Sequence, residues 1–175
     1  MGASHRIDLE RFVPFRLNRL ASEVSRALAR VYGERFGIDI PEWRIIATLG
    51  DRGQARAQDI ALSTRMHKSM VSRAVARLME LGWVARTANA SDRREAPLAL
   101  TTSGCDVYAR LVPVVLDYQD RLLACLTGSE RRQLDRLLDK LERELDLPCR
   151  PARPEPRGRE VAAALPEPSS AAPGS

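Results

Sequence analysis

Residues 67–77 combine hydroxyl, imidazole and basic side chains with a helical repeat of apolar positions. Val71, Val75 and Leu78 would share one side of a helix, because residues three and four apart lie on the same face. The polar side chains would then face solvent, where they could reach the phosphates and base edges of a DNA major groove. The candidate DNA-contacting residues of this segment are His67, Lys68, Ser69, Met70, Ser72, Arg73 and Arg77.

Three of these residues are predicted to have distinct roles. Arg73 is best placed for a base contact, because a guanidinium can pair with two acceptors of a guanine at once. Arg77 is predicted to contact a phosphate. His67 either caps the helix or touches a phosphate. Small hydroxyls and the positive end of the helix dipole at this N-terminus also favour an anion.

A second charged group, Asp92, Arg93 and Arg94, lies between two short apolar segments. Residues 83–86 and 96–100 are predicted as strands, so the polar stretch between them would form the tip of a hairpin. Arginine at such a tip suits the narrow, electronegative minor groove of A·T-rich DNA. Asp92 would orient Arg94 through a charge-assisted hydrogen bond.

The positive charge of the chain is concentrated around these two groups. The formal net charge is +5. Residues 63–95 hold seven Lys and Arg against three acidic residues. A basic helix alone is most often an ordinary solvated helix face. Together with an arginine-tipped hairpin, it indicates DNA binding.

Other chemistries have little support in the sequence. It contains no nucleophile elbow, phosphate-binding glycine loop or metalloprotease helix, so we expect no enzyme. The cysteines, Cys105, Cys125 and Cys149, are far apart, and the histidines, His5 and His67, sit in no ligand cluster. We therefore expect no disulfide, metal or cofactor, and regard a redox switch as the weaker alternative to a ligand. No apolar run is long enough to span a membrane, and a cytoplasmic protein is expected.

The surrounding sequence predicts the elements that position the candidate residues. Helices are expected at about 9–35, 42–49, 57–63, 67–81, 102–126 and 129–145, with strands at 83–86 and 96–100. Pro14 and Pro113 should kink or bend their helices. Gly50 and Gly53 should close the second helix, and Pro97 should make its strand an edge. The predicted fold is mainly α with a small β-hairpin wing, a winged helix-turn-helix with long N- and C-terminal dimerisation helices.

This order of predicted helices and strands divides the chain into four segments. Residues 37–101 form the predicted DNA-binding lobe, and residues 5–36 and 102–147 form the dimerisation helices. These helices carry apolar stripes that need a partner, most simply a second copy of the chain. Residues 148–175 hold seven of the eleven prolines and are predicted to be a disordered tail rich in Pro, Ala and Arg.

The chain resembles the MarR (multiple antibiotic resistance regulator) family over about residues 9–146. The resemblance is carried by Ile40-Pro41-Glu42-Trp43-Arg44, Ser69-Met70-Val71-Ser72-Arg73, Arg77-Leu78, Leu81-Gly82-Trp83-Val84, Asp92-Arg93-Arg94 and Leu100-Thr101-Thr102-Ser103-Gly104. It implies a homodimer, a palindromic operator, repression relieved by a small ligand, and entry of Arg94 into the minor groove. His67 departs from the Ser- or Asp-type cap frequent in the family, which predicts a weaker cap.

The resemblance also implies an effector site between the dimerisation helices and the DNA-binding lobe. The candidates by position are Phe15, Arg16, Arg19, Trp43 and Tyr108. Aromatic rings beside arginine suit a small aromatic carboxylate or its thioester. The segment 15–20 is similar to the branch of the family that controls aromatic-acid catabolism. The alternative is that the rings are core and the arginines pair with helix-surface carboxylates.

A second class of function stays open at this point. The chain could be a helical dimerisation module whose winged lobe binds protein. The clustering of positive charge favours double-stranded DNA as the partner instead.

Overall fold

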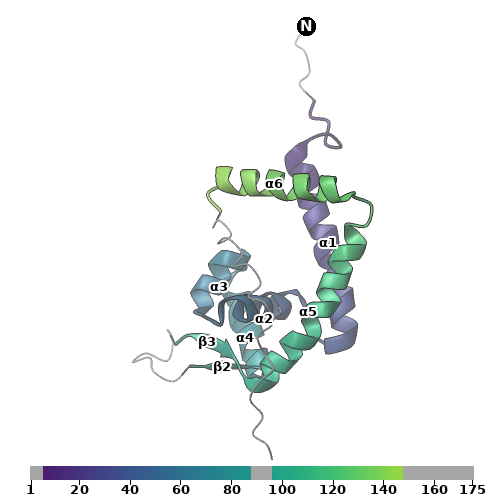
Figure 1. The fold of residues 1–175 in the computed structure, drawn as a ribbon. Coiled ribbons are helices and arrows are strands. Elements are labelled where there is room, and N and C mark those ends of the chain that lie inside the picture. Colours follow the sequence, from purple (N-terminus) through teal and green to yellow (C-terminus); the bar gives the residue numbers. More distant parts are fainter. Residues whose placement is uncertain (1–5, 88–95, 148–175) are drawn as a thin grey trace, which may run out of the picture. The chain divides into compact units, whose positions relative to one another are not determined.

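The computed structural model describes residues 6–87 and 96–147, and it is mainly helical with one small sheet (Figure 1). The elements are α1 (Val13–Phe36), α2 (Ile40–Arg52), β1 (Gln54–Ala55), α3 (Ala57–Thr64), α4 (Lys68–Glu80), β2 (Val84–Arg86), β3 (Leu98–Leu100), α5 (Thr102–Leu122) and α6 (Gly128–Glu144). This order confirms the predicted fold class. The chain divides into two compact units at Leu134 and Asp135, within α6. The predicted tail, residues 148–175, lies outside the described residues.

Helix α1 begins four residues later than the apolar stripe predicts. Pro14 stands in its first turn, where the missing N–H of proline costs no hydrogen bond. The stripe residues before it form a turn instead, in which the Phe12 N–H donates to the Leu9 carbonyl (3.3 Å). The helix ends at Gly37, whose φ of 65° lies in the left-handed region that glycine adopts without a steric penalty.

Helix α2 starts with a reciprocal cap and runs further than expected. The Asp39 carboxylate accepts from the Glu42 N–H, and the Glu42 carboxylate accepts from the Asp39 N–H. Gly50 was predicted to close the helix, and that prediction is wrong because α2 continues to Arg52. Gly50 instead lets the Tyr108 ring of α5 approach, since a Cβ at this position would clash with that ring. Gly53, with φ of 76°, is the cap.

Helices α3 and α4 form the helix-turn-helix. Arg65, after α3, adopts a left-handed conformation with φ of 56°. The Met66 side chain turns into the core, and His67 caps α4. Both helices lie within one or two residues of their predicted bounds, because their apolar spacing and flanking breaks are unambiguous.

The sheet has three antiparallel strands in the order β1-β3-β2. Val84 pairs with Leu100, and Ala55 pairs with Leu98. The prediction that Pro97 makes its strand an edge is wrong, because the two-residue β1 covers the other side of β3. Pro97 lies just before β3, and its carbonyl accepts from the Thr87 N–H (2.9 Å).

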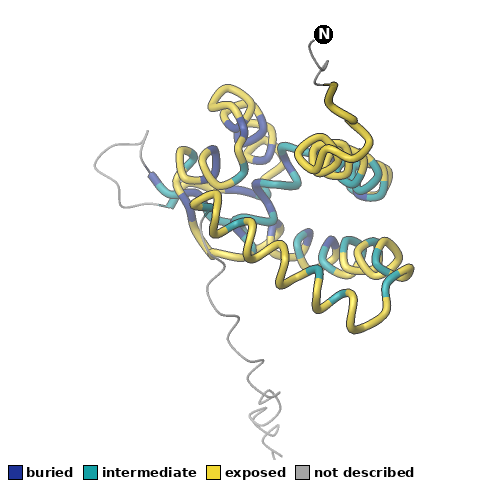
Figure 2. Tube along the Cα trace, turned by 90° about the horizontal axis from the view of Figure 1, so that it is seen from above, coloured by how far each residue is buried: buried dark blue, intermediate teal, exposed yellow. Residues whose placement is uncertain are grey.

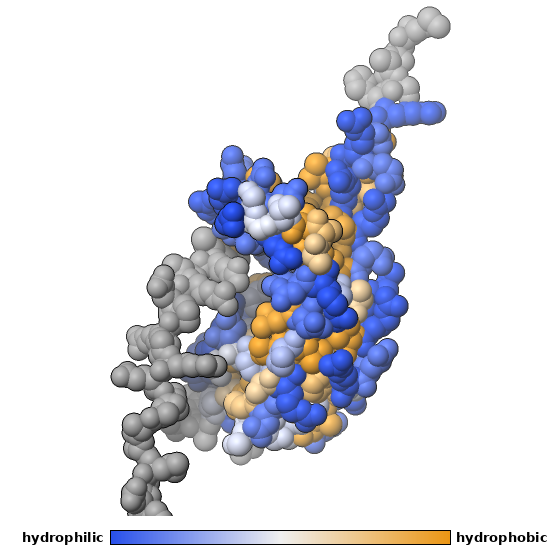
Figure 3. Space-filling view, turned by 45° about the vertical axis from the view of Figure 1, so that its right-hand side comes forward, coloured by the Kyte–Doolittle hydropathy of each residue, from blue (hydrophilic) through white to orange (hydrophobic). Residues whose placement is uncertain are grey.

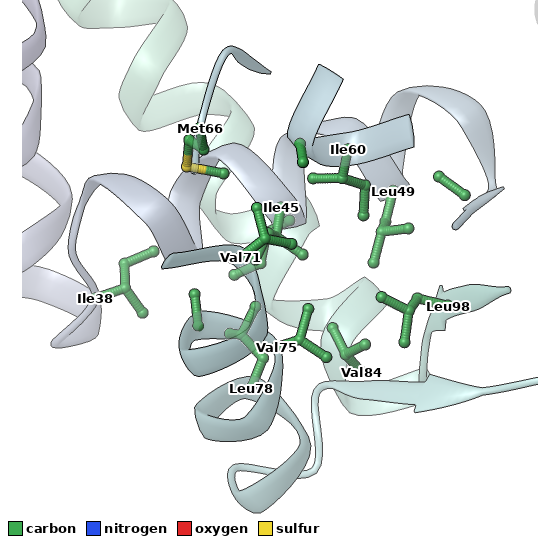
Figure 4. Close-up of a cluster of buried hydrophobic side chains, with 14 of the residues drawn as sticks. Ile38, Ile45, Leu49, Ile60, Met66, Val71, Val75, Leu78, Val84 and Leu98 are labelled. Carbon is green, nitrogen blue, oxygen red and sulfur yellow. The ribbon is translucent and has the colours of Figure 1, made fainter. Parts of the chain in front are cut away.

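The hydrophobic core lies between α2, α3, α4 and the sheet (Figure 4). Ile45, Ile60, Leu78 and Leu98 are fully buried there. In Figure 2 the buried positions gather in this lobe, whereas the first half of α1 is exposed. Burying a Leu or Ile side chain contributes about 1.5–3 kcal/mol, so this cluster holds the two helices of the motif in one orientation.

Helix α5 joins this lobe to α1, beside which it lies (Figure 1). The Tyr118 hydroxyl donates to the Val24 carbonyl (3.4 Å), and the Arg110 guanidinium lies 5.6 Å from the centre of the Phe36 ring. None of the helices in the described ranges is both long and apolar enough to cross a membrane.

Candidate nucleic-acid interface

Helix α4 has one buried face and one exposed face. Its buried residues are Val71, Ala74, Val75 and Leu78. The predicted DNA-contacting residues on it, namely Lys68, Ser69, Met70, Ser72, Arg73 and Arg77, are all exposed. This division arises because the apolar side chains recur every three to four residues, which leaves the polar ones on the far side.

His67 holds the N-terminus of α4. Its Nδ1 accepts a hydrogen bond from the Ser69 N–H (3.3 Å) and lies 2.8 Å from the Ser69 hydroxyl oxygen. Of the two predicted roles, the structure therefore shows His67 capping the helix. The first turn of α4 contains no acidic residue, so the positive end of the helix dipole is not neutralised locally.

Arg73 lies in the middle of the exposed face of α4. Within residues 6–87 and 96–147 it forms neither a hydrogen bond nor an ion pair, and the same holds for Lys68 and Ser72. These side chains therefore have donor groups to offer a partner. Beside Arg73 lies a hollow of about 320 Å³, which Asp39, Met70 and other residues line.

A second hollow places α4 and the base of the hairpin on one surface. It measures about 520 Å³ and is lined by Lys68 and Ser72 of α4, by Gln58 of α3 and by Arg86 of β2. The strands leading into the hairpin therefore share a side of the molecule with the exposed face of α4. The predicted tip residues Asp92, Arg93 and Arg94 lie outside the described residues.

Arg77, predicted to contact a phosphate, has two partners within the protein. Its Nε lies 2.9 Å from the Glu42 carboxylate, and its Nη2 donates to the Gly37 carbonyl (3.3 Å). Burial raises the pKa of Glu42 above its ordinary value, while the Asp39 N–H and the Arg77 charge oppose that shift. No local pattern in the sequence indicates this contact between Arg77 and Glu42. The Asp39-x-x-Glu42 spacing of a capping box was the available signal for the helix start.

The five predicted effector residues fall into two groups in a single chain. Phe15, Arg16 and Arg19 are exposed near the start of α1. Arg19 lies 5.6 Å from the Phe15 ring centre and pairs with Glu10 at 3.1 Å.

The other two effector candidates are half-buried against the DNA-binding lobe. Trp43 stacks on Tyr32 of α1 with 5.7 Å between ring centres, and Tyr108 packs at Gly50. Phe15 and Tyr32 are separated by about 25 Å along α1, at 1.5 Å per residue. One chain therefore does not bring the two groups together. The described residues also contain no cluster of His, Cys, Asp or Glu that could hold a metal ion.

Known proteins resemble this chain in sequence and in fold. The profile of the MarR family matches residues 36–95. The repressor Mb2911 of Mycobacterium bovis is 30% identical over 122 residues, which span 70% of this chain and 84% of that protein. A MarR/EmrR family regulator from Acinetobacter sp. ADP1 superposes with a TM-score of 0.72 at 28% identity, covering 80% of this chain and 99% of that one.

A further solved structure, NadR in complex with 4-hydroxyphenylacetate, shares the fold. Its TM-score is 0.63 at 22% identity, with 81% of this chain and 96% of that one covered. A helix-turn-helix repressor and a MarR/EmrR family regulator thus match this chain over most of their length, and the residues that match the MarR family include the exposed helix α4. This chain belongs to the MarR family of DNA-binding transcriptional regulators, which are not enzymes.

Proposed function

We propose that the chain is a ligand-responsive repressor that binds a palindromic operator as a homodimer. The observation that carries the proposal is the exposed face of α4, where Lys68, Ser72 and Arg73 have no partner among the described residues. In this proposal Arg73 pairs with a base edge, and Lys68 and Ser72 contact phosphates. The hairpin, through Arg94, enters the adjacent minor groove.

The homodimer is supported by apolar side chains that the single chain leaves exposed. On α1 and the residues before it, these are Leu9, Phe12, Val13, Leu17 and Leu20; on α6, they are Leu137, Leu138, Leu141 and Leu145. Figure 3 shows apolar side chains at the surface on the side of α1 and α5. Leucines on α6 that the periodicity predicts as a buried face are therefore exposed in one chain. A second copy is the occupant we propose, because it would repeat the same stripes about a twofold axis.

The salt dependence of binding tests this function. A duplex selected from a random pool by the wild-type chain serves as the probe, and fluorescence anisotropy measures its dissociation constant. If a dimer neutralises six or more phosphates, the slope of log affinity against log salt should be about −5 or steeper. A slope flatter than about −2, or failure to select any duplex, would contradict the proposal and favour a protein-binding lobe.

The effector we propose is a small aromatic carboxylate or its thioester. Trp43 and Tyr108 supply rings beside the DNA-binding lobe, and Phe15, Arg16 and Arg19 supply a ring and two cations from α1. Because these groups are far apart in one chain, a shared site requires the second copy to bring its α1 to the first. NadR shows that this fold can hold an aromatic carboxylate.

Such a ligand would release DNA if it bound more tightly to a dimer in which the two α4 helices are not spaced to fit successive major grooves of the operator. A coupling of about 1–3 kcal/mol would lower DNA affinity roughly 5- to 150-fold. Regulation of aromatic-acid catabolism is the context that this ligand class suggests.

Thermal unfolding with benzoate, 4-hydroxyphenylacetate or benzoyl-coenzyme A tests the effector. A ligand present at about 100 times its dissociation constant stabilises the native state by about 2.7 kcal/mol, so the unfolding temperature should rise by several degrees. Cyclohexanecarboxylate is the control for the aromatic ring. If no aromatic acid raises the unfolding temperature at millimolar concentration, this part of the proposal is wrong.

A further inference from the structure

Glu42 is the one charged side chain that is buried in the part of the chain that the structure describes. It is 4% exposed, in the first turn of α2. One carboxylate oxygen lies 2.9 Å from the Arg77 Nε, and the other accepts from the Asp39 N–H at 2.7 Å. Both oxygens are therefore engaged, one within the cap of α2 and one across to α4.

Arg77 connects three parts of the lobe. It extends from the recognition helix α4, one turn beyond Arg73, and reaches Glu42 on α2. Its Nη2 also donates to the carbonyl of Gly37, the residue that ends α1 (3.3 Å). A single guanidinium thus joins α4 to the junction between α1 and α2. Its planar fork fixes direction as well as distance, which a lysine would not do.

The hydrogen bond that Glu42 accepts in the cap of α2 does not require a charge. A glutamine can replace glutamate in a capping box, because its side-chain oxygen accepts the same hydrogen bond. Burial also raises the pKa of Glu42, so the ionised carboxylate is less favourable here than in the unfolded chain. Glu42 is buried whereas the Arg77 side chain is 54% exposed, so this half-exposed ion pair is weak evidence for stabilisation, but it can specify a single arrangement of the elements it joins.

We infer that Arg77 is a positioning residue whose ion pair with Glu42 sets the orientation of α4 on the α1–α2 junction. The inference rests on the proposed contact of α4 with DNA, and it replaces the predicted phosphate contact of Arg77. With the pair in place, Arg73 leaves α4 in a fixed direction. Without it, α4 keeps its hydrophobic packing but loses its polar attachment to α2 and to Gly37.

A double-mutant cycle with Glu42→Gln and Arg77→Met tests the inference. In Glu42→Gln the amide oxygen can still accept from the Asp39 N–H, and the amide N–H₂ then faces a guanidinium with which it cannot pair. Each variant should bind the selected duplex about 3- to 30-fold more weakly. The double variant should bind about as weakly as Arg77→Met alone, because Arg77→Met already removes the contact that Glu42→Gln removes. The salt slope should stay at the wild-type value in all three.

A matched control comes from the exposed ion pair of Glu23 and Arg26 on α1. The Arg26 Nη1 lies 2.9 Å from the Glu23 Oε1, the same distance as in the pair of Arg77 and Glu42. Glu23→Gln and Arg26→Met should change affinity less than about twofold, because an exposed pair contributes little. The unfolding temperature of Glu42→Gln should stay close to that of the wild type, because the lost burial of a charge offsets the unpaired amide N–H₂. A marked fall in its unfolding temperature would make the pair merely structural and overturn the inference.

A phosphate contact of Arg77 would give different results from those expected for a positioning residue. If Arg77 contacts a phosphate, Arg77→Met should flatten the salt slope by about one unit per chain, and Glu42→Gln should leave affinity unchanged or raise it. That outcome overturns the positioning role alone, since the wild type still binds DNA. A wild-type chain that selects no duplex overturns the proposed function and this inference together.

Discussion

Replacing Arg73 with Ala should weaken operator binding more than any other single change on the exposed face of α4. A bidentate contact between arginine and a base discriminates by about 1–3 kcal/mol, and a dimer would make two, so affinity should fall roughly 30-fold or more. Sequence preference should relax at the base pair that Arg73 reads. Anisotropy titrations against the selected duplex, and against duplexes changed at single base pairs, measure both effects.

Two controls separate this effect from a general loss of charge or fold. Arg26→Ala also removes one positive charge, from an exposed ion pair on α1, and should leave affinity nearly unchanged. Unfolding of the Arg73→Ala variant should match the wild type, because this side chain is exposed. Equal weakening on all sequences, with no loss of discrimination, would assign Arg73 to a phosphate instead.

Leu137→Glu combined with Leu141→Glu should separate the dimer and abolish tight operator binding. Both leucines are exposed on one side of α6, at 52% and 45%, and carboxylates there would have to be desolvated in a dimer interface. A monomer engages one half-site at a time, so affinity should fall by about 10²- to 10⁴-fold. Analytical ultracentrifugation at micromolar concentration gives the mass, and anisotropy gives the affinity.

The matched control places two carboxylates on polar positions of the same helix. Gln133→Glu with Lys140→Glu should leave the dimer intact, because both residues are exposed and polar. A wild-type chain that sediments as a monomer, or a double-leucine variant that remains a dimer with full affinity, would show that α6 does not form the interface.

The helices could be predicted because their apolar residues recur with a period near 3.6. The exposed face of α4 follows from that period, since Val71, Val75 and Leu78 must turn inward together. The start of α1 was missed because the apolar stripe continues through a turn before Pro14. The spacing of apolar residues alone does not distinguish the first turn of a helix from a non-helical turn that precedes it.

The predictions that Pro97 marks an edge strand and that Gly50 ends α2 are wrong for the same reason. Both features depend on residues that are distant in the sequence. The two-residue strand β1 has no period to detect and exists because it pairs with β3. That pairing makes β3 central despite Pro97. Gly50 would end an isolated helix, but here it admits Tyr108 of α5, which lies 58 positions further along the chain.

The candidate site shows the same limit. Residue types and spacing predicted that Lys68, Ser72 and Arg73 lie on the exposed face of α4, and their exposure depends only on their own helix. They gave no sign of the contact between Arg77 and Glu42, because Glu42 lies 35 positions earlier and becomes a neighbour only through packing of α2 on α4. Local patterns therefore locate the exposed face, and the fold decides which of its side chains remain available.

Protection of guanine N7 from dimethyl sulfate tests most directly whether the exposed face of α4 reads the major groove, where N7 is displayed. On the selected duplex, wild-type protein should protect guanines in two major-groove segments about 10 base pairs apart. Arg73→Ala should lose that protection at one symmetric position in each half. Unprotected N7 atoms throughout a duplex that the protein still binds would show that α4 lies outside the major groove and does not read bases there.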